Sequence, residues 1–70
     1  MVKFAQVQEG AVVQLGRFNK SNSEHSHKVG LVVSKQTLKI GKSVWSAITV
    51  EVEPGQRLLV NINNIKSILN

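Results

Sequence analysis

The chain has 70 residues and no cysteine, and its nine lysines and arginines against four glutamates give a formal net charge of +5. This length allows one small domain with one thin core, and the lack of cysteine excludes a disulfide framework and a thiolate metal site. No apolar run approaches the ~20 residues of a membrane span, and no signal peptide is recognisable, so a cytoplasmic protein without membrane contact is expected. The basic balance favours a polyanion or an acidic protein surface as partner.

Short apolar runs punctuated by glycine and proline predict β-strands and no helix of useful length. The first predicted strand is AVVQL at 11–15, and the second is VGLVVSKQ at 29–36. In the second strand, the period of two places Leu31 and Val33 on the core face. The polar stretch 17–28 is expected to form a long loop between these strands.

The alternation of apolar and polar residues is clearest between 43 and 62. Pro54-Gly55 predicts a turn that divides this region into a third and a fourth strand. Trp45 falls on the face that two glutamates mark as solvated, with Arg57, Leu59 and Asn61 on the same face after the turn. The core face carries the apolar side chains Val44, Ile48, Val50, Val52, Leu58, Val60 and Ile62.

The end of the chain predicts a tight helical turn at Asn63-Asn64, followed by a short last strand at 66–69. An open sheet this small would leave two edges and one bare face, so we expect residues 1–70 to form one all-β, five-stranded barrel. In it the first strand pairs with the last, and Phe4 and Val7 cover one open end. The predicted core is Val13, Leu15, Leu31, Val33, Ile48, Val50, Leu58, Val60, Ile65 and Ile68.

The chain resembles the SH3-like small barrels through four segments, EGAVVQL, KVGLVVS, AITVEV and RLLVNINNIKSIL. In that superfold a long loop precedes the second strand, and one tight helical turn separates the fourth strand from the fifth, where this chain has NINNI. The segment KVGLVV is similar to the glycine-centred strand of nucleic-acid-binding KOW modules. As a compact and basic protein, the chain also resembles the accessory proteins that bacteriophages encode. The resemblance therefore implies a non-enzymatic binding module of that type.

An enzymatic group with the same kind of fold is also similar in layout. The run VEVEPGQRLLVNINNIKSILN resembles the end of the plasmid-encoded, trimethoprim-resistant dihydrofolate reductases, which build one pore from four small barrels. Their pore strand carries Val-Gln-Ile-Tyr, whereas this chain has Leu58, Leu59, Val60 and Asn61 and no tyrosine. Glu51 and Glu53 have no identifiable acid/base partner, and no serine has a paired base. We therefore expect no enzymatic activity and no cofactor.

Trp45 is the sharpest candidate for a contact residue, because the pattern predicts an exposed ring beside Leu59 on the neighbouring strand. A flat ring flanked by cations can stack a base while the cations hold phosphate. This predicts nucleic-acid binding, either DNA or RNA, by Trp45 and Leu59 with a set of basic residues: Arg17, Lys28, Lys35, Lys39, Lys42 and Arg57.

Other interpretations of the same residues stay open. Trp45 and Leu59 could anchor a protein-interaction or inhibitor module that docks on a host protein or on a second copy of the chain. Trp45 could instead cover one end of the barrel, and the lysines could form an edge that resists aggregation.

His25 and His27 form an H-x-H motif in the polar loop. On an extended chain, both imidazoles would point to one side, as two ligands of a metal require. No third ligand is identifiable, so we expect solvated or pH-responsive histidines and no metal.

Overall fold

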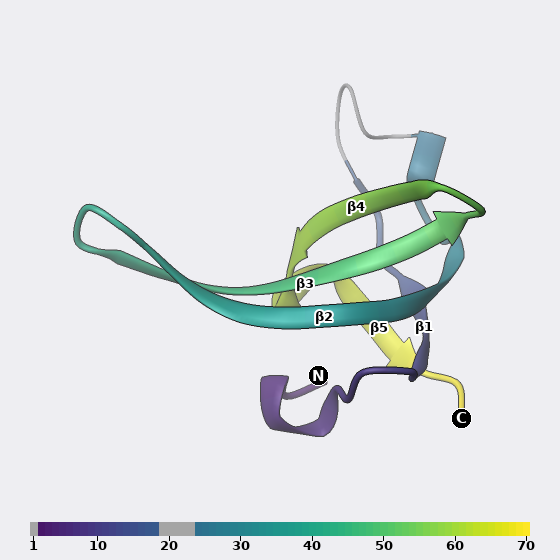
Figure 1. The fold of residues 1–70 in the computed structure, drawn as a ribbon, viewed down its shortest axis with the longest axis horizontal. Helices are drawn as coiled ribbons and strands as arrows, with labels where there is room; N and C mark the ends of the chain where they lie inside the picture. Colours follow the sequence, from purple (N-terminus) through teal and green to yellow (C-terminus); the bar gives the residue numbers. More distant parts are fainter. Residues whose placement is uncertain (1, 19–23) are drawn as a thin grey trace.

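A computed structural model describes residues 2–18 and 24–70 of the chain, and it contains one antiparallel sheet without an α-helix in these ranges (Figure 1). The predicted loop is therefore described except for 19–23. The strands are β1 (Val12–Leu15), β2 (Val29–Ile40), β3 (Ser43–Glu53), β4 (Gln56–Asn61) and β5 (Ile65–Ile68). Short 3-10 turns accompany them, among them η1 (Phe4–Gln6) and η3 (Ile62–Asn64). The prediction of an all-β fold with five strands is confirmed, including the helical turn before the last strand.

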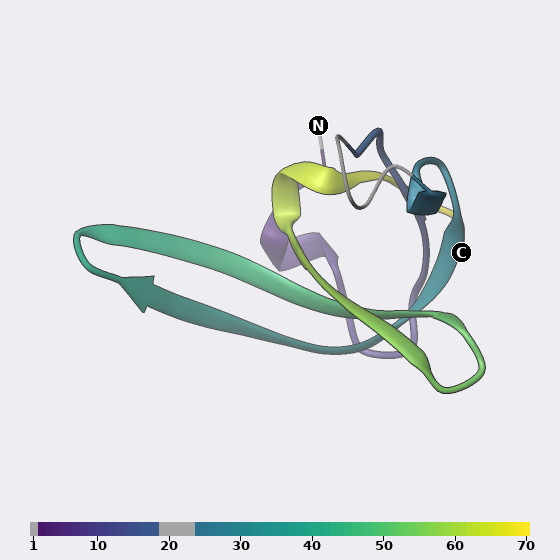
Figure 2. The same ribbon diagram turned by 90° about the horizontal axis from the view of Figure 1, so that it is seen from above.

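The strands follow the order β4-β3-β2-β1-β5, and β1 pairs with β5 as expected. β4 and β5 are the two ends of this order, joined by η3, and the described residues form no ladder between them. The sheet therefore bends around the core without closing completely. Figure 2 shows this curvature and a long β2–β3 hairpin that projects away from it.

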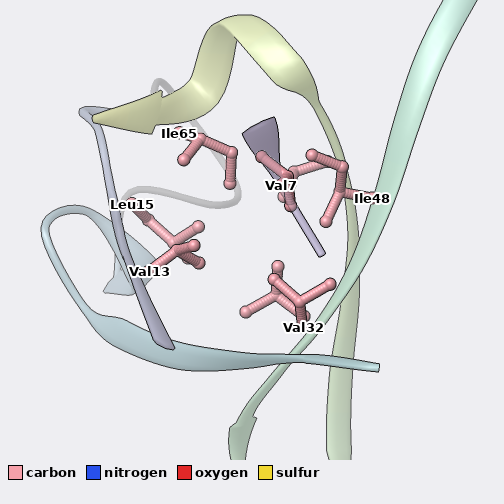
Figure 3. Close-up of a cluster of buried hydrophobic side chains, with 8 residues drawn as sticks. Val7, Val13, Leu15, Val32, Ile48 and Ile65 are labelled. Carbon is pink, nitrogen blue, oxygen red and sulfur yellow. The ribbon is translucent and has the colours of Figure 1, made fainter. Parts of the chain in front are cut away.

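The core lies inside the curve of the sheet (Figure 3). Val7, which follows η1, is fully buried there, and Phe4 packs against the same cluster. The expectation that these two residues cover an open end of the core is thus confirmed. The buried apolar side chains of the cluster are Val7, Val13, Leu15, Val32, Ile48, Val50, Val60 and Ile65.

The predicted core face of β2 is wrong. Val32 is buried and Leu31 is exposed, which reverses the expected phase. The cause is Gly30, where an added Cβ would overlap Cγ1 of Val50. Glycine lets β2 and β3 approach closely. Because Gly30 has no side chain, the apolar alternation of the sequence does not reveal that position 30 faces the core. The register then shifts between Val32 and Ser34, which leaves the predicted core residue Val33 only half-buried at an irregularity in the strand.

The β2–β3 hairpin is also longer than expected, because β2 continues to Ile40. β1 pairs only with the first residues of β2, and β4 reaches only as far as Ala47 on β3. Beyond these points no strand of the described residues pairs with the hairpin. Val44, predicted in the core, is consequently 61% exposed. We call residues 37–46 the arm, and the rest of the sheet the sheet body.

Candidate functional site

The arm is a two-stranded ribbon closed by a two-residue turn. Thr37 pairs with Ser46 at its base, and Ile40 pairs with Ser43 next to the turn at Gly41-Lys42. Gly41 has a φ of 60°, the left-handed region that a tight hairpin turn requires at this position. At ~3.3 Å per residue, the four paired positions extend the ribbon by about 13 Å beyond the sheet body. Figures 1 and 2 show the arm standing clear of the remaining strands.

The register gives the arm two different faces, because side chains alternate along each strand and paired residues share a face. Val44 lies on the same face of β3 as the core residue Ile48, and we call this the inner face. Its members on the arm are Thr37, Lys39, Val44 and Ser46. The opposite, outer face carries Leu38, Ile40, Ser43 and Trp45. The two faces thus differ in chemistry, one basic and polar, the other mostly apolar.

The inner face and the tip hold exposed positive charge without nearby carboxylates. Lys39 and Lys42 are both exposed, and the segment from Ser34 to Ser46 contains three lysines and no acidic residue. The four glutamates of the chain lie elsewhere, at positions 9, 24, 51 and 53. The arm therefore carries an uncompensated positive potential at the part of the molecule that reaches furthest from the core.

Lys35, at the base of the same face, is engaged within the molecule. Its Nζ donates a hydrogen bond of 3.2 Å to the carbonyl oxygen of Phe4 and lies 4.8 Å from the centre of the Phe4 ring. This cation–π contact ties η1 to the inner face of β2. Lys35 therefore anchors the N-terminal segment. Lys39, four residues further along β2, is exposed.

The other predicted cations are not gathered around Trp45. Arg57 forms an ion pair of 3.3 Å with Glu51, and Lys28 forms one of 3.3 Å with Glu53. Both pairs lie on the sheet body, at the end of β3 away from the arm. Arg17 is exposed just after β1. The structure thus brings together Lys39 and Lys42 with the neighbouring anchor Lys35, and separates them from the remaining predicted cations.

Trp45 is 40% exposed on the outer face, and Leu59 is 51% exposed on the same face of the sheet. The predicted position of Trp45 beside Leu59 across the hairpin is wrong, because Leu59 pairs with Thr49, four residues from Trp45 along β3, and Trp45 pairs with Leu38. Trp45 also lies on the face opposite Lys39. A base stacked on the indole would therefore not have its phosphate beside that lysine.

Sequence reasoning missed two exposed apolar residues near the tip, Ile40 and Val44. The signal for Ile40 was the dipeptide Gly41-Lys42, which can close a hairpin and thereby extend both strands to the turn. For Val44 the signal was absent, since its spacing matches that of the buried residues on β3.

The H-x-H motif does not form a shared metal site. The expected solvation is wrong for His25, which is buried with Nε2 3.4 Å from Oε1 of Glu24, and right for His27, which is exposed with a φ of 63°. Within the described ranges, no three histidine or acidic side chains are grouped as a metal would need, and no pocket is present. The same ranges contain no helix of sufficient length and hydrophobicity to cross a bilayer.

Comparisons with known proteins found no relative of this chain. The chain matches no protein-family model, and neither the curated proteins nor the solved structures yielded a match. The arm, with its basic inner face and apolar outer face, is therefore the feature from which function must be argued.

Proposed function

We propose that this protein is a non-enzymatic nucleic-acid-binding module that contacts duplex DNA with the inner face and tip of the arm. The supporting observation is a projecting two-stranded ribbon that presents Lys39 and Lys42 with no carboxylate between Ser34 and Ser46. Phosphate contacts from such lysines supply affinity that is largely independent of base sequence.

The shape of the arm supports a duplex as the ligand. The major groove of B-form DNA is about 12 Å wide and accepts a two-stranded β-ribbon. A-form RNA has a deep and narrow major groove that excludes such an element. Val44, exposed directly opposite Lys39 on the inner face, offers an apolar surface of the kind that contacts a thymine methyl group. DNA is therefore favoured over double-stranded RNA.

Two or three lysine–phosphate contacts predict weak, salt-sensitive binding. Non-specific protein–DNA complexes have dissociation constants of roughly 10⁻⁴–10⁻⁶ M at physiological salt. With a slope of about −0.9 per contact in a plot of log K against log salt, the affinity should fall about 10- to 40-fold between 50 and 200 mM salt.

The test is fluorescence anisotropy of a labelled DNA duplex titrated with the full chain at several salt concentrations. The double variant Lys39→Gln, Lys42→Gln should weaken binding and reduce the salt slope by about two. Lys66→Gln is the matched control, because Lys66 is an exposed lysine on β5, away from the arm. This control should change the slope by less than one.

An equal loss in the control and the double variant would show that the net charge, and not the arm, attracts DNA. Absence of binding at 50 mM salt would overturn the proposal altogether. Tighter binding to an RNA duplex of the same sequence would overturn the choice of ligand.

A further inference from the structure

The outer face of the arm continues without interruption onto the outer face of the sheet body. On β3 this face contains alternate residues from Ser43 to Glu51. Each of them forms a cross-strand row with its partner on β2, and from Ala47 onward also with a partner on β4. Four exposed apolar residues are distributed along these rows, Ile40, Trp45, Leu59 and Leu31. We call the whole strip the outer stripe.

The outer stripe has the size of one side of an ordinary protein interface. Taking ~200–250 Å² for a fully exposed large apolar or aromatic residue, the exposed parts of these four amount to roughly 400 Å². A stable interface buries about 800 Å² per partner, of which slightly more than half is apolar. The neighbouring polar residues Gln36, Thr49 and Asn61 lie in the same rows and would complete that area.

Charge selects the partner for this stripe. The only charged side chains in its rows are Glu51 and Arg57, which form an ion pair with each other. The stripe therefore has no net charge, although the chain carries +5. An acidic protein would be attracted to the inner face and tip instead. A second copy can approach the stripe without meeting a net charge on it, because Glu51 and Arg57 of each copy neutralise each other.

The rows are also arranged symmetrically about Ala47, a small and fully buried residue in the middle of the stripe. Trp45 lies two residues from it in one direction, and Thr49, the partner of Leu59, lies two residues away in the other. β4 supplies no partner opposite Trp45, because its ladder with β3 ends at Ala47. No strand is therefore paired with β3 on that side of the 40% exposed Trp45, and a two-fold axis through Ala47 would place Leu59 of another molecule there.

From these observations we infer that the outer stripe is a homodimer interface. Two copies pack stripe to stripe about a two-fold axis at Ala47, with Trp45 of each copy against Leu59 of the second copy. A self-complementary interface of this kind closes after two subunits. The basic inner faces then point away from the contact. This dimer goes beyond the proposed DNA binding and can form or fail independently of it.

The first measurement is sedimentation equilibrium of the full chain up to about 1 mM, with the fluorescence of Trp45, the only tryptophan, as a second readout. We expect a concentration-dependent dimer and a blue-shifted indole emission as it forms. Added salt should leave this dimer intact or strengthen it, because salt screens the repulsion between two basic subunits. DNA binding by the arm should weaken under the same conditions.

The decisive variants are Trp45→Lys and Leu59→Glu. Each alone should raise the dimer dissociation constant at least about tenfold, because both of its intersubunit contacts then bury an unpaired charge. An equimolar mixture should recover association as a heterodimer. In that heterodimer one contact is the original Trp45–Leu59 pair, and the other joins the introduced lysine to the introduced glutamate.

Leu69→Glu is the matched control, since Leu69 is also 51% exposed but follows β5, away from the stripe. This variant should dimerise like the parent chain. Circular dichroism and thermal melting of every variant verify the fold, which substitutions at exposed positions should preserve. A monomer at all concentrations overturns the inference. A dimer that tolerates both charged variants, or variants that do not combine as a heterodimer, overturns the assigned interface.

Discussion

β2 and β3 run from the sheet body into the arm without a break, yet the two halves of this hairpin have opposite burial. Ile48 is fully buried, while Val44, on the same face of the same strand, is 61% exposed. The strand alternation is the same in both halves. The two halves differ in what surrounds them, because β4 and the N-terminal segment cover only the half that belongs to the sheet body. Burial here depends on where the adjacent strands end, and the exposed half becomes available for binding.

The largest predicted difference between the sheet body and the arm is the loss of stability when an apolar side chain of each is shortened to alanine. Ile48→Ala should lower the free energy of unfolding by about 2–5 kcal/mol, because it leaves a cavity in a packed core. Val44→Ala is the matched variant on the arm and should change it by less than about 0.5 kcal/mol. Urea unfolding followed by circular dichroism measures both. Similar losses for the two variants would mean that the arm is packed in solution.

Substitution of Gly30 tests whether the close approach of β2 and β3 decides which residues of β2 face the core. Gly30→Ala should destabilise the protein by about 1–3 kcal/mol, since the added Cβ meets both Cγ1 of Val50 and, at 3.0 Å, the carbonyl oxygen of Glu51. Gly16→Ala is the control, because its Cβ would come no closer than 3.4 Å to any atom. Urea unfolding of both variants is the measurement. Equal stability of the two would contradict the inward position of Gly30.

The two hairpin turns distinguish local from global stability. Gly41 and Gly55 both have positive φ, but Gly41 closes the arm and Gly55 closes the β3–β4 hairpin of the sheet body. Alanine at either position should cost about 1 kcal/mol. Gly55→Ala should lower global stability, whereas Gly41→Ala should speed amide hydrogen exchange within residues 37–46 only. A global loss from Gly41→Ala would show that the arm and sheet body unfold as one unit.

The smallest predicted effect is the difference in stability loss between substitution of Lys35 and substitution of Lys39, which both lie on the inner face of β2. Lys35→Met should cost about 0.5–1 kcal/mol, because it removes the hydrogen bond and the cation–π contact with Phe4. Lys39→Met removes an exposed charge from the arm and should leave stability within about 0.5 kcal/mol. Thermal unfolding compares the two. A larger loss from Lys39→Met would mean that Lys39 also anchors part of the fold.

Local patterns predicted most of the fold. The turn at Pro54-Gly55 and the helical turn at 62–64 are confirmed, and so is the alternation that buries Ile48, Val50 and Val60. These features depend on residues close together in sequence. The positions of Phe4 and Val7 were also predicted, because a small sheet must cover an open end.

The candidate site was predicted less completely. Trp45 is on the solvated face as expected, and Lys35, Lys39 and Lys42 do lie along one hairpin. The alternation in β3 could not show that Lys39 and Trp45 lie on opposite faces, because this follows from the register between two strands. Equally, the involvement of Lys35 with Phe4 joins segments that are 31 residues apart.

Alternating apolar residues, turn dipeptides and an excess of lysine are properties of the sequence by itself. They determined that this chain forms a small β-sheet, where its strands turn, and that it carries positive charge into one hairpin. Only the tertiary structure decided which residues of β2 face the core, that Val44 is exposed, and where the hairpin leaves the sheet. The physical reason is that burial depends on the extent of neighbouring strands and on contacts such as that of Gly30 with Val50, which arise when distant segments meet.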